Sequence, residues 1–318
     1  MRRIPLGVLL LLPFVMTISL AQRSNYMMSY VSRGLERYQN GDASGAIADY
    51  NIALMIDPGY PEAYNNRGLA YYAKGDVEAA MADYGKALEL NSGFAAVYNN
   101  RGVARYSRND VPGALADYSK AVELDPRYSA AFNNRGVLHY AQGDFEAALS
   151  DFNKAIELNP KEISAYTNRA DTRKILGDVK GALSDYSRSI KLDHNNPIAY
   201  DHRGALLWKE GNLDGALVNF EKAVELNPQF AEAYQNRGVV KREKGSLDAA
   251  IADFTKAIEL KPGYAMAYAS RGIALWLQGK KSDADRDFAQ TVKLDANLGP
   301  FIHAKTQRIA PLTATVRK

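Results

Sequence analysis

Hydrophobic and polar positions along the chain follow a short helical period and a much longer one. Small and aromatic residues recur every three or four positions, as at Tyr64, Gly68 and Tyr71, a spacing that predicts an amphipathic helix. Gly75 interrupts this pattern and Asp76 can cap a following helix. The sequence therefore predicts one helix over about 62–74 and a second over about 77–90, joined by a glycine turn.

The longer period is 34 residues. The predicted helix pair recurs without insertion or deletion over residues 27–60, 61–94, 95–128, 129–162, 163–196, 197–230, 231–264 and 265–298. A fixed period of this length is typical of a solenoid of stacked repeats. We number positions from 1 within each repeat, so that Pro61 is position 1. Position 20 is always Ala and position 8 is Gly except at Ala170, which indicates close approach of the two helices.

The order of these positions resembles the tetratricopeptide repeat. Aromatic position 4, small position 8, Ala at position 20 and aromatic position 24 recur in register from Met27 to Leu298. The resemblance implies an all-α, right-handed superhelical solenoid of antiparallel helix pairs, with about eight repeats and a concave groove lined by the first helices. Residues 299–318 are expected to form a capping helix and a basic tail.

Position 7 departs from that family, in which it is usually Leu, because it is Arg in every repeat. Position 23 is acidic in all repeats except the sixth, which has Asn219. We expect structural ion pairs, since the arginine fork suits a carboxylate. An arginine row facing an anionic ligand is disfavoured, because position 7 lies more than about 90° around the helix from groove positions 2, 9 and 13. The predicted pairs involve Arg67, Arg101 and Arg135 with Asp83, Asp117 and Asp151.

Amide and aromatic side chains are the candidate ligand contacts of the groove. A side-chain amide offers a donor and an acceptor together, so a row of amides could bind the backbone of an extended peptide of any sequence. The alternative is that these amides belong to the repeat consensus and only help to set helix packing. The candidates are Asn66, Asn100, Asn134, Asn168 and Asn236 at position 6, Asn65, Asn99 and Asn133 at position 5, and Tyr72, Tyr106, Tyr140 and Trp208 at position 12.

The N-terminus resembles a secretory signal peptide. Arg2 and Arg3 precede an uncharged apolar run over residues 4–20, which ends at a small-x-small site. We therefore expect residues 1–21 to be removed, a short tail over 22–26, and a periplasmic or secreted protein. An uncleaved inner-membrane anchor formed by residues 4–20, with the repeats outside the cytoplasm, is the alternative and the only membrane contact expected.

Composition narrows the possible functions. The formal net charge of +4 falls to +2 without Arg2 and Arg3, so nucleic acid is not an expected partner. There is no cysteine, and the four histidines lack the spacing of a metal site. No catalytic motif is present. We therefore expect no cofactor, no metal and no enzymatic activity.

The function predicted from sequence is a protein-interaction scaffold of the cell envelope that binds an extended peptide or partner segment. The first alternative is a module that binds cell-wall or exopolysaccharide glycans through aromatic stacking and amide hydrogen bonds. The second alternative is a non-catalytic subunit of an envelope enzyme or secretion complex. The first repeat is unusually apolar, with Met27, Met28, Val31 and Met55, and could be an adapted end repeat or a site of self-association.

Overall fold

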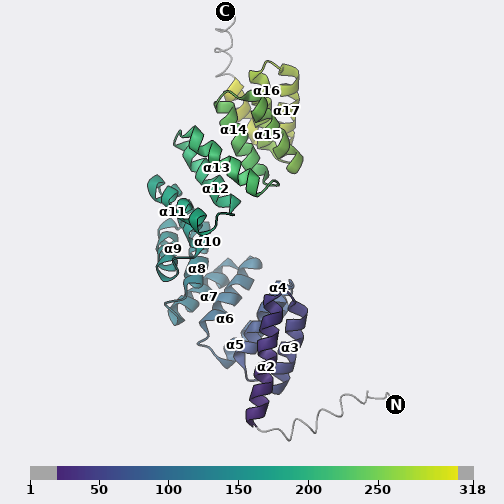
Figure 1. The fold of residues 1–318 in the computed structure, drawn as a ribbon, viewed down its shortest axis with the longest axis vertical. Coiled ribbons are helices and arrows are strands. Elements are labelled where there is room, and N and C mark those ends of the chain that lie inside the picture. The colour runs from purple at the N-terminus through teal and green to yellow at the C-terminus, as the bar shows by residue number, and fades with distance from the viewer. Residues whose placement is uncertain (1–19, 307–318) are drawn as a thin grey trace, which may run out of the picture. The chain divides into compact units, whose positions relative to one another are not determined.

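The computed structural model describes residues 20–306, and the helices there follow one another with no strand between them. The chain divides into two compact units, residues 1–160 and 161–318 (Figure 1). The described part of the first contains α2 (Leu20–Gln39), α3 (Ala43–Ile56), α4 (Pro61–Ala73), α5 (Val77–Leu90), α6 (Ala95–Ser107), α7 (Val111–Leu124), α8 (Ser129–Ala141) and α9 (Phe145–Leu158). That of the second contains α10 (Ile163–Ile175), α11 (Val179–Leu192), α12 (Pro197–Lys209), α13 (Leu213–Leu226), α14 (Ala231–Glu243), α15 (Leu247–Leu260), α16 (Ala265–Leu277), α17 (Lys281–Leu294) and the 3₁₀ helix η1 (Ala296–Leu298).

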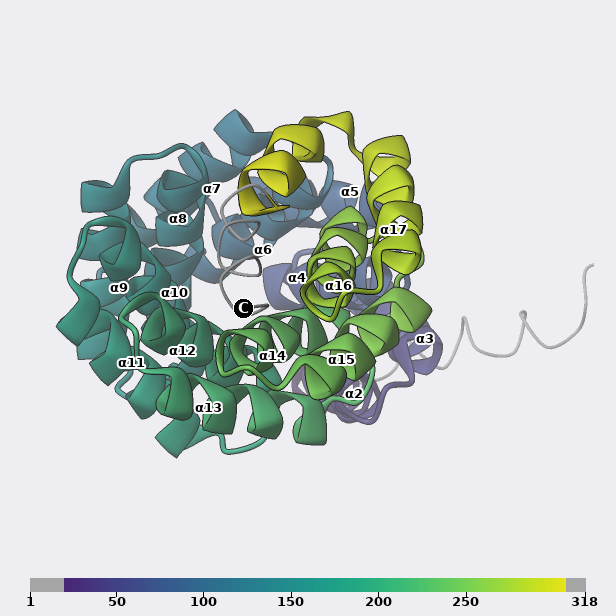
Figure 2. The ribbon, with the colours of Figure 1, turned by 90° about the horizontal axis from the view of Figure 1, so that it is seen from above.

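Helices pack in consecutive pairs within each unit. The first helix of a repeat packs against its own second helix, and that second helix packs against the first helix of the next repeat. First helices also contact each other directly, as α4 does with α6 and α12 with α14. Figure 2 shows the first helices on the inner side of each unit and the second helices on the outer side. The predicted all-α solenoid of helix pairs is confirmed. We call the surface formed by positions 6, 9, 12 and 13 of the first helices the inner face.

Local sequence signals place the helix ends. Gly75 adopts a φ of 82°, which a residue with a Cβ rarely takes, and so ends α4. The Asp76 carboxylate then accepts a hydrogen bond from the Ala79 N–H at 3.1 Å and caps α5. In the third repeat Asn109 replaces the turn glycine and keeps a positive φ of 62°.

The core of each repeat depends on the glycine at position 8. Tyr84 is fully buried and its ring lies directly against Gly68. A Cβ built at Gly68 would come within 2.6 Å of the ring. Ala80 is fully buried on the same side of α5. Small residues at positions 8 and 20 therefore let the two helices close around one large aromatic side chain.

The beginning of the first repeat differs from the expected one. Residues 22–26, predicted to be a short tail, are the early turns of α2, which is 20 residues long against 13 in α4. No Gly or Pro interrupts this segment, and Arg23 Nη2 donates to the carbonyl of Ile56 at 3.3 Å. That contact joins the extra turns of α2 to the end of α3.

The ends of the chain lie partly outside the described residues. The predicted signal peptide or anchor lies outside the described residues except for Leu20 and Ala21, which begin α2. Within residues 20–306, no helix combines the length and the apolar character required to cross a bilayer. Residues 299–306 are helical, and Ile302 is buried there. The remainder of the predicted capping helix and basic tail is outside the described part.

Candidate functional site

The arginines at position 7 bind the acidic residues at position 23 of their own repeats. Arg67 donates from Nε and Nη2 to the two carboxylate oxygens of Asp83, at 2.8 and 2.6 Å. The aspartate is buried and the arginine side chain is 19% exposed. Burial alone would lower the pKa of Arg67, but the hydrogen bonds and charge of Asp83 raise it above the usual value. The same two bonds join Arg101 to Asp117 at 2.9 and 2.7 Å and Arg135 to Asp151 at 2.8 and 2.7 Å.

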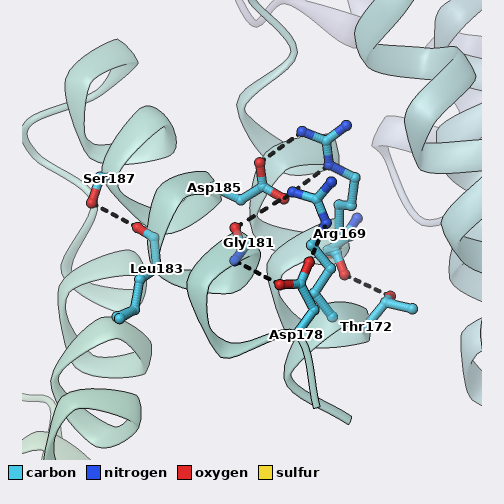
Figure 3. Close-up of polar contacts among 9 residues, drawn as sticks. Arg169, Thr172, Asp178, Gly181, Leu183, Asp185 and Ser187 are labelled. Atoms are coloured by element: carbon cyan, nitrogen blue, oxygen red, sulfur yellow. Dashed lines mark hydrogen bonds and ion pairs between the residues drawn. The ribbon is translucent and has the colours of Figure 1, made fainter. Parts of the chain in front are cut away.

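Several of these aspartates have a second cationic partner that the sequence analysis missed. Asp185 accepts from Arg169 (Figure 3) and also from Arg173, whose Nη1 lies 2.7 Å away. Positions 7 and 11 are one helical turn apart, so both side chains reach the same carboxylate. Equivalent second contacts join Arg37 to Asp49 at 3.1 Å, Arg105 to Asp117 at 2.9 Å and Lys241 to Asp253 at 2.8 Å. The sequence feature that could have revealed this second cation is its i, i+4 spacing from the arginine at position 7.

The sixth repeat has a neutral version of this network. Arg203 Nε donates to Asn219 Oδ1 at 2.8 Å, and Nη1 donates to the Ser187 hydroxyl at 3.2 Å. Position 11 is Leu207. Without a carboxylate partner, burial lowers the pKa of Arg203, whereas the pKa of Arg67 is raised. The carboxylate at position 23 therefore stabilises the charged form of the position-7 arginine, as Asp83 does for Arg67, whereas the neutral Asn219 does not do so for Arg203.

The amides at positions 5 and 6 form hydrogen bonds between neighbouring repeats. Asn100 Nδ2 donates to Asn65 Oδ1 at 2.9 Å, and Asn134 Nδ2 donates to Asn99 Oδ1 at 2.9 Å. In the second unit, Asn236 makes the same bond to Asp201 at 2.9 Å. Each contact spans 35 residues, from position 5 of one repeat to position 6 of the next.

These contacts correct part of the predicted groove. The asparagines at position 5 are buried, and two of them accept the bonds just described, so they belong to the packing between repeats and do not line the inner face. Position 6 is half-buried at Asn66, Asn100, Asn134, Asn168 and Asn236. The buried position-5 residues are Asn65, Asn99 and Asn133. The predicted groove residues therefore separate into a structural row and a row that remains accessible.

The aromatic residues at position 12 lie on the inner face to different degrees. Tyr106 is 45% exposed and Trp208 is 39% exposed, whereas Tyr72 and Tyr140 are half-buried. The ring of Tyr140 makes an edge contact with Phe145, with centroids 5.6 Å apart. Trp208 Nε1 donates to Glu243 Oε2 in the next repeat at 2.7 Å. These rings offer stacking surface along the inner face of each unit.

A cluster of charged groups interrupts the regular pattern between repeats five and six. Asp171, at position 9, accepts from Lys174 Nζ and the Tyr186 hydroxyl, both at 2.7 Å, and lies 3.2 Å from His202 Nδ1. Burial alone would raise the pKa of Asp171, but His202, Lys174 and Tyr186 together lower it to about 2. This part of the inner face therefore carries a fixed carboxylate with an imidazole beside it. Across residues 20–306, no three His, Asp or Glu side chains are grouped as a metal site would require.

Comparisons with known proteins agree with this architecture. A family model described as the tetratricopeptide repeat matches residues 61–94 and 129–162. A second, described as the TPR repeat, matches residues 34–75, 102–143, 207–241 and 240–279. Together these matches cover more than half of the chain. No curated protein matches it significantly.

Three solved structures are similar to this chain over different lengths. YrrB, described as a TPR protein with an unusual peptide-binding site, is 30% identical over 58% of this chain and 95% of its own, with a TM-score of 0.49. PilF of Pseudomonas aeruginosa is 23% identical over 65% of this chain and 94% of its own, with a TM-score of 0.60. The APC/C hetero-tetramer Cut9–Hcn1 matches 93% of this chain and 57% of its own at 17% identity, with a TM-score of 0.64. The last two likenesses concern the fold alone.

Proposed function

Because the chain belongs to the tetratricopeptide repeat family, whose members are generally non-catalytic scaffolds, we propose that it binds an extended segment of a partner protein along the inner face of its first helices. The observation that carries this proposal is the remaining hydrogen-bonding capacity of the position-6 amides. This holds for Asn100, Asn134 and Asn236, which are half-buried and are each oriented by a hydrogen bond to the preceding repeat.

Asn100 shows the capacity in detail. One of its N–H groups donates to Asn65, and its oxygen accepts from Asn99 Nδ2 at 3.4 Å. An amide has two N–H donors and two acceptor lone pairs, so Asn100 retains one of each. One donor and one acceptor are what a peptide group of an extended backbone requires. The bond to Asn65 orients the amide before the ligand arrives, which lowers the entropic cost of binding.

Photo-cross-linking in intact cells tests this proposal. A photoreactive residue at Asn100 is expected to give a discrete adduct, mapped by mass spectrometry to one segment of a partner. The matched control is Ala116, which is exposed on the outer helix α7 and should not give that adduct. For the mapped segment, Asn100→Ala should weaken binding about tenfold, or about 1.4 kcal/mol. The same adducts from both positions would contradict the proposal.

Glycan binding is a second candidate function, favoured by the exposed rings of Tyr106 and Trp208. Aromatic faces stack on sugar rings, and the neighbouring amides could bond hydroxyl groups. Titration with cell-wall or exopolysaccharide fragments distinguishes this candidate. Affinity that is lost in Tyr106→Ala, together with no protein adduct from Asn100, would favour the glycan over the peptide.

We also propose that the protein acts outside the cytoplasm, on the basis of the signal-like residues 1–21. N-terminal sequencing of the protein from fractionated cells tests this directly. A mature chain that begins near Gln22 is expected in the exported fraction. A full-length chain in the membrane fraction would favour the anchored alternative, and a full-length chain in the cytoplasm would contradict both.

Self-association through the first repeat is proposed from its apolar surface. Tyr26, Met28 and Leu35 of α2 are exposed, and Met55 of α3 is 73% exposed. Apolar side chains gathered at the end of a repeat array can form a contact between copies. Sedimentation that depends on concentration and disappears in Met28→Glu is expected. Sedimentation that does not change with concentration would identify an end repeat that simply remains exposed.

A further inference from the structure

The residues at position 12 have different chemistry in the two units. In the first unit this position is Tyr in every repeat, at Tyr38, Tyr72, Tyr106 and Tyr140. In the second unit it alternates between a cation and a tryptophan, as Lys174, Trp208, Arg242 and Trp276 on helices α10, α12, α14 and α16. Lys174 is paired with Asp171 within its own helix. Arg242 is different.

Arg242 has a guanidinium nitrogen that is removed from water without a partner. Its Nη1 atom is covered, and none of the described residues forms a hydrogen bond with it. Burial lowers the pKa of Arg242, and the adjacent Glu243 opposes this only in part. The Glu243 carboxylate accepts the indole N–H of Trp208. By contrast, Arg237 on the same helix bonds to both oxygens of Asp253, at 2.8 and 2.6 Å.

An uncompensated charge in a partly dry site favours binding of an anion. Burying a charge without a partner is unfavourable, and a carboxylate that pairs with the guanidinium removes this penalty. Arg242 as a whole is only half-buried, so part of its side chain remains accessible. A carboxylate fits the planar guanidinium with two parallel hydrogen bonds.

The tryptophans on either side provide apolar contacts. Trp208 is 39% exposed on α12, the helix next to Arg242. Trp276, on the other neighbouring helix, lines a cavity of about 260 Å³. The apolar side chains of Phe288, Val292 and Ile302 also line this cavity. It is large enough for an aliphatic or aromatic side chain.

We propose that Trp208, Arg242 and Trp276 form a subsite for an extended acidic peptide segment, in which an Asp or Glu side chain pairs with Arg242. This inference rests on the proposed peptide-binding function. Packed helices lie about 8–10 Å apart, and an extended chain advances about 3.3 Å per residue, so one helix corresponds to about three residues. An apolar residue about three positions to one side of the acid then packs on Trp208, and another on the opposite side enters the cavity beside Trp276.

The two tryptophans are the only ones in the sequence, so tryptophan fluorescence, excited selectively over that of the tyrosines, reports directly on this site. The probe is a synthetic seven-residue peptide, Leu-Ser-Ser-Glu-Ser-Ser-Phe, blocked at both ends, and its counterpart with Gln in place of Glu. The full-length protein is expected to bind the Glu peptide at least tenfold more tightly than the Gln peptide. Arg242→Gln should abolish this difference, while circular dichroism shows an unchanged fold. Lys174→Gln is the matched control and should preserve the difference.

Equal affinity for the two peptides in the wild-type protein would overturn the inference, as would a Glu preference that persists in Arg242→Gln. The proposed function has a separate outcome. A discrete peptide adduct from Asn100 without any Glu preference at Arg242 would leave the scaffold function in place and remove this subsite. A Glu preference without an adduct from Asn100 would retain this subsite and remove Asn100 from the peptide-binding surface.

Discussion

The arginine networks predict that the same substitution has graded effects in different repeats. Arg67→Met keeps the aliphatic stem of the side chain but removes both bonds to the buried Asp83. Position 11 of this repeat is Tyr71, so no second cation remains. Removing one partner of a buried pair costs about 3–5 kcal/mol, and partial exposure of the Arg67 side chain places the expected loss near the lower end, at about 3 kcal/mol.

The matched substitutions have smaller expected effects. After Arg101→Met, Asp117 still lies 2.9 Å from Arg105, so we expect a loss of about 1–2 kcal/mol. Arg203→Met removes bonds to neutral partners only, and we expect a loss of about 1 kcal/mol. The order of destabilisation should therefore be Arg67, then Arg101, then Arg203.

Hydrogen exchange resolved to individual helices is the appropriate measurement, because stability in a repeat array is distributed along the chain. The loss of protection in Arg67→Met should be largest in α4 and α5. Adding Asp83→Asn to this variant should recover most of the loss, since the unpaired buried charge is then gone. Equal losses in the three single variants, or no recovery in the double variant, would refute the reasoning.

Three further predictions concern local packing, backbone geometry and pH. Gly68→Ala should destabilise its repeat by about 1–3 kcal/mol, because the new Cβ meets the Tyr84 ring. Gly85→Ala, on the open surface of a helix, should stabilise the repeat by about 1 kcal/mol. Thermal unfolding of the two variants should therefore show shifts of opposite sign. At the positive-φ turn, Asn109→Ala should cost about 1 kcal/mol and Asn109→Gly should not, as urea unfolding would show. The pKa of Asp171 is depressed from 3.8 to about 2, so its stabilisation is present above pH 4 and lost as the pH falls towards 2; hydrogen exchange in α10 and α11 should record a loss of about 2 kcal/mol that is absent from Asp171→Asn.

The sequence was sufficient to predict the elements and their order, because the relevant signals are local. Gly75 and Asp76 end one helix and begin the next through their own backbone and side-chain geometry, and the structure confirms both. The 34-residue period then repeats the same local solution. The extra turns of α2 were missed because the stabilising contact from Arg23 to Ile56 comes from a distant part of the chain.

The side chains of the site were less predictable. The helical period places positions 5 and 6 side by side, but it does not show that position 5 is covered by the neighbouring repeat. That burial depends on contacts 35 residues away, such as Asn65 with Asn100. The second cation at position 11 was visible in principle from its spacing, but its identity varies among Arg, His and Lys, and Tyr71, Leu207 and Leu275 replace it in three repeats. Its role follows from the shared carboxylate, which only the structure shows.

Comparing the repeats within this one chain separates structural from ligand-related positions. A residue that holds neighbouring helices together meets the same surroundings in each repeat, so its type should recur, as Arg does at position 7. A residue that recognises a ligand meets a different part of that ligand in each repeat, so its type should change. Position 12 changes from tyrosine throughout the first unit to alternating cations and tryptophans in the second. Arg242 is the sharpest case, because a structural guanidinium in this chain has a hydrogen-bonding partner at position 23, and Nη1 of Arg242 has none among the described residues. We therefore expect a ligand bound on the inner face to supply its counter-charge.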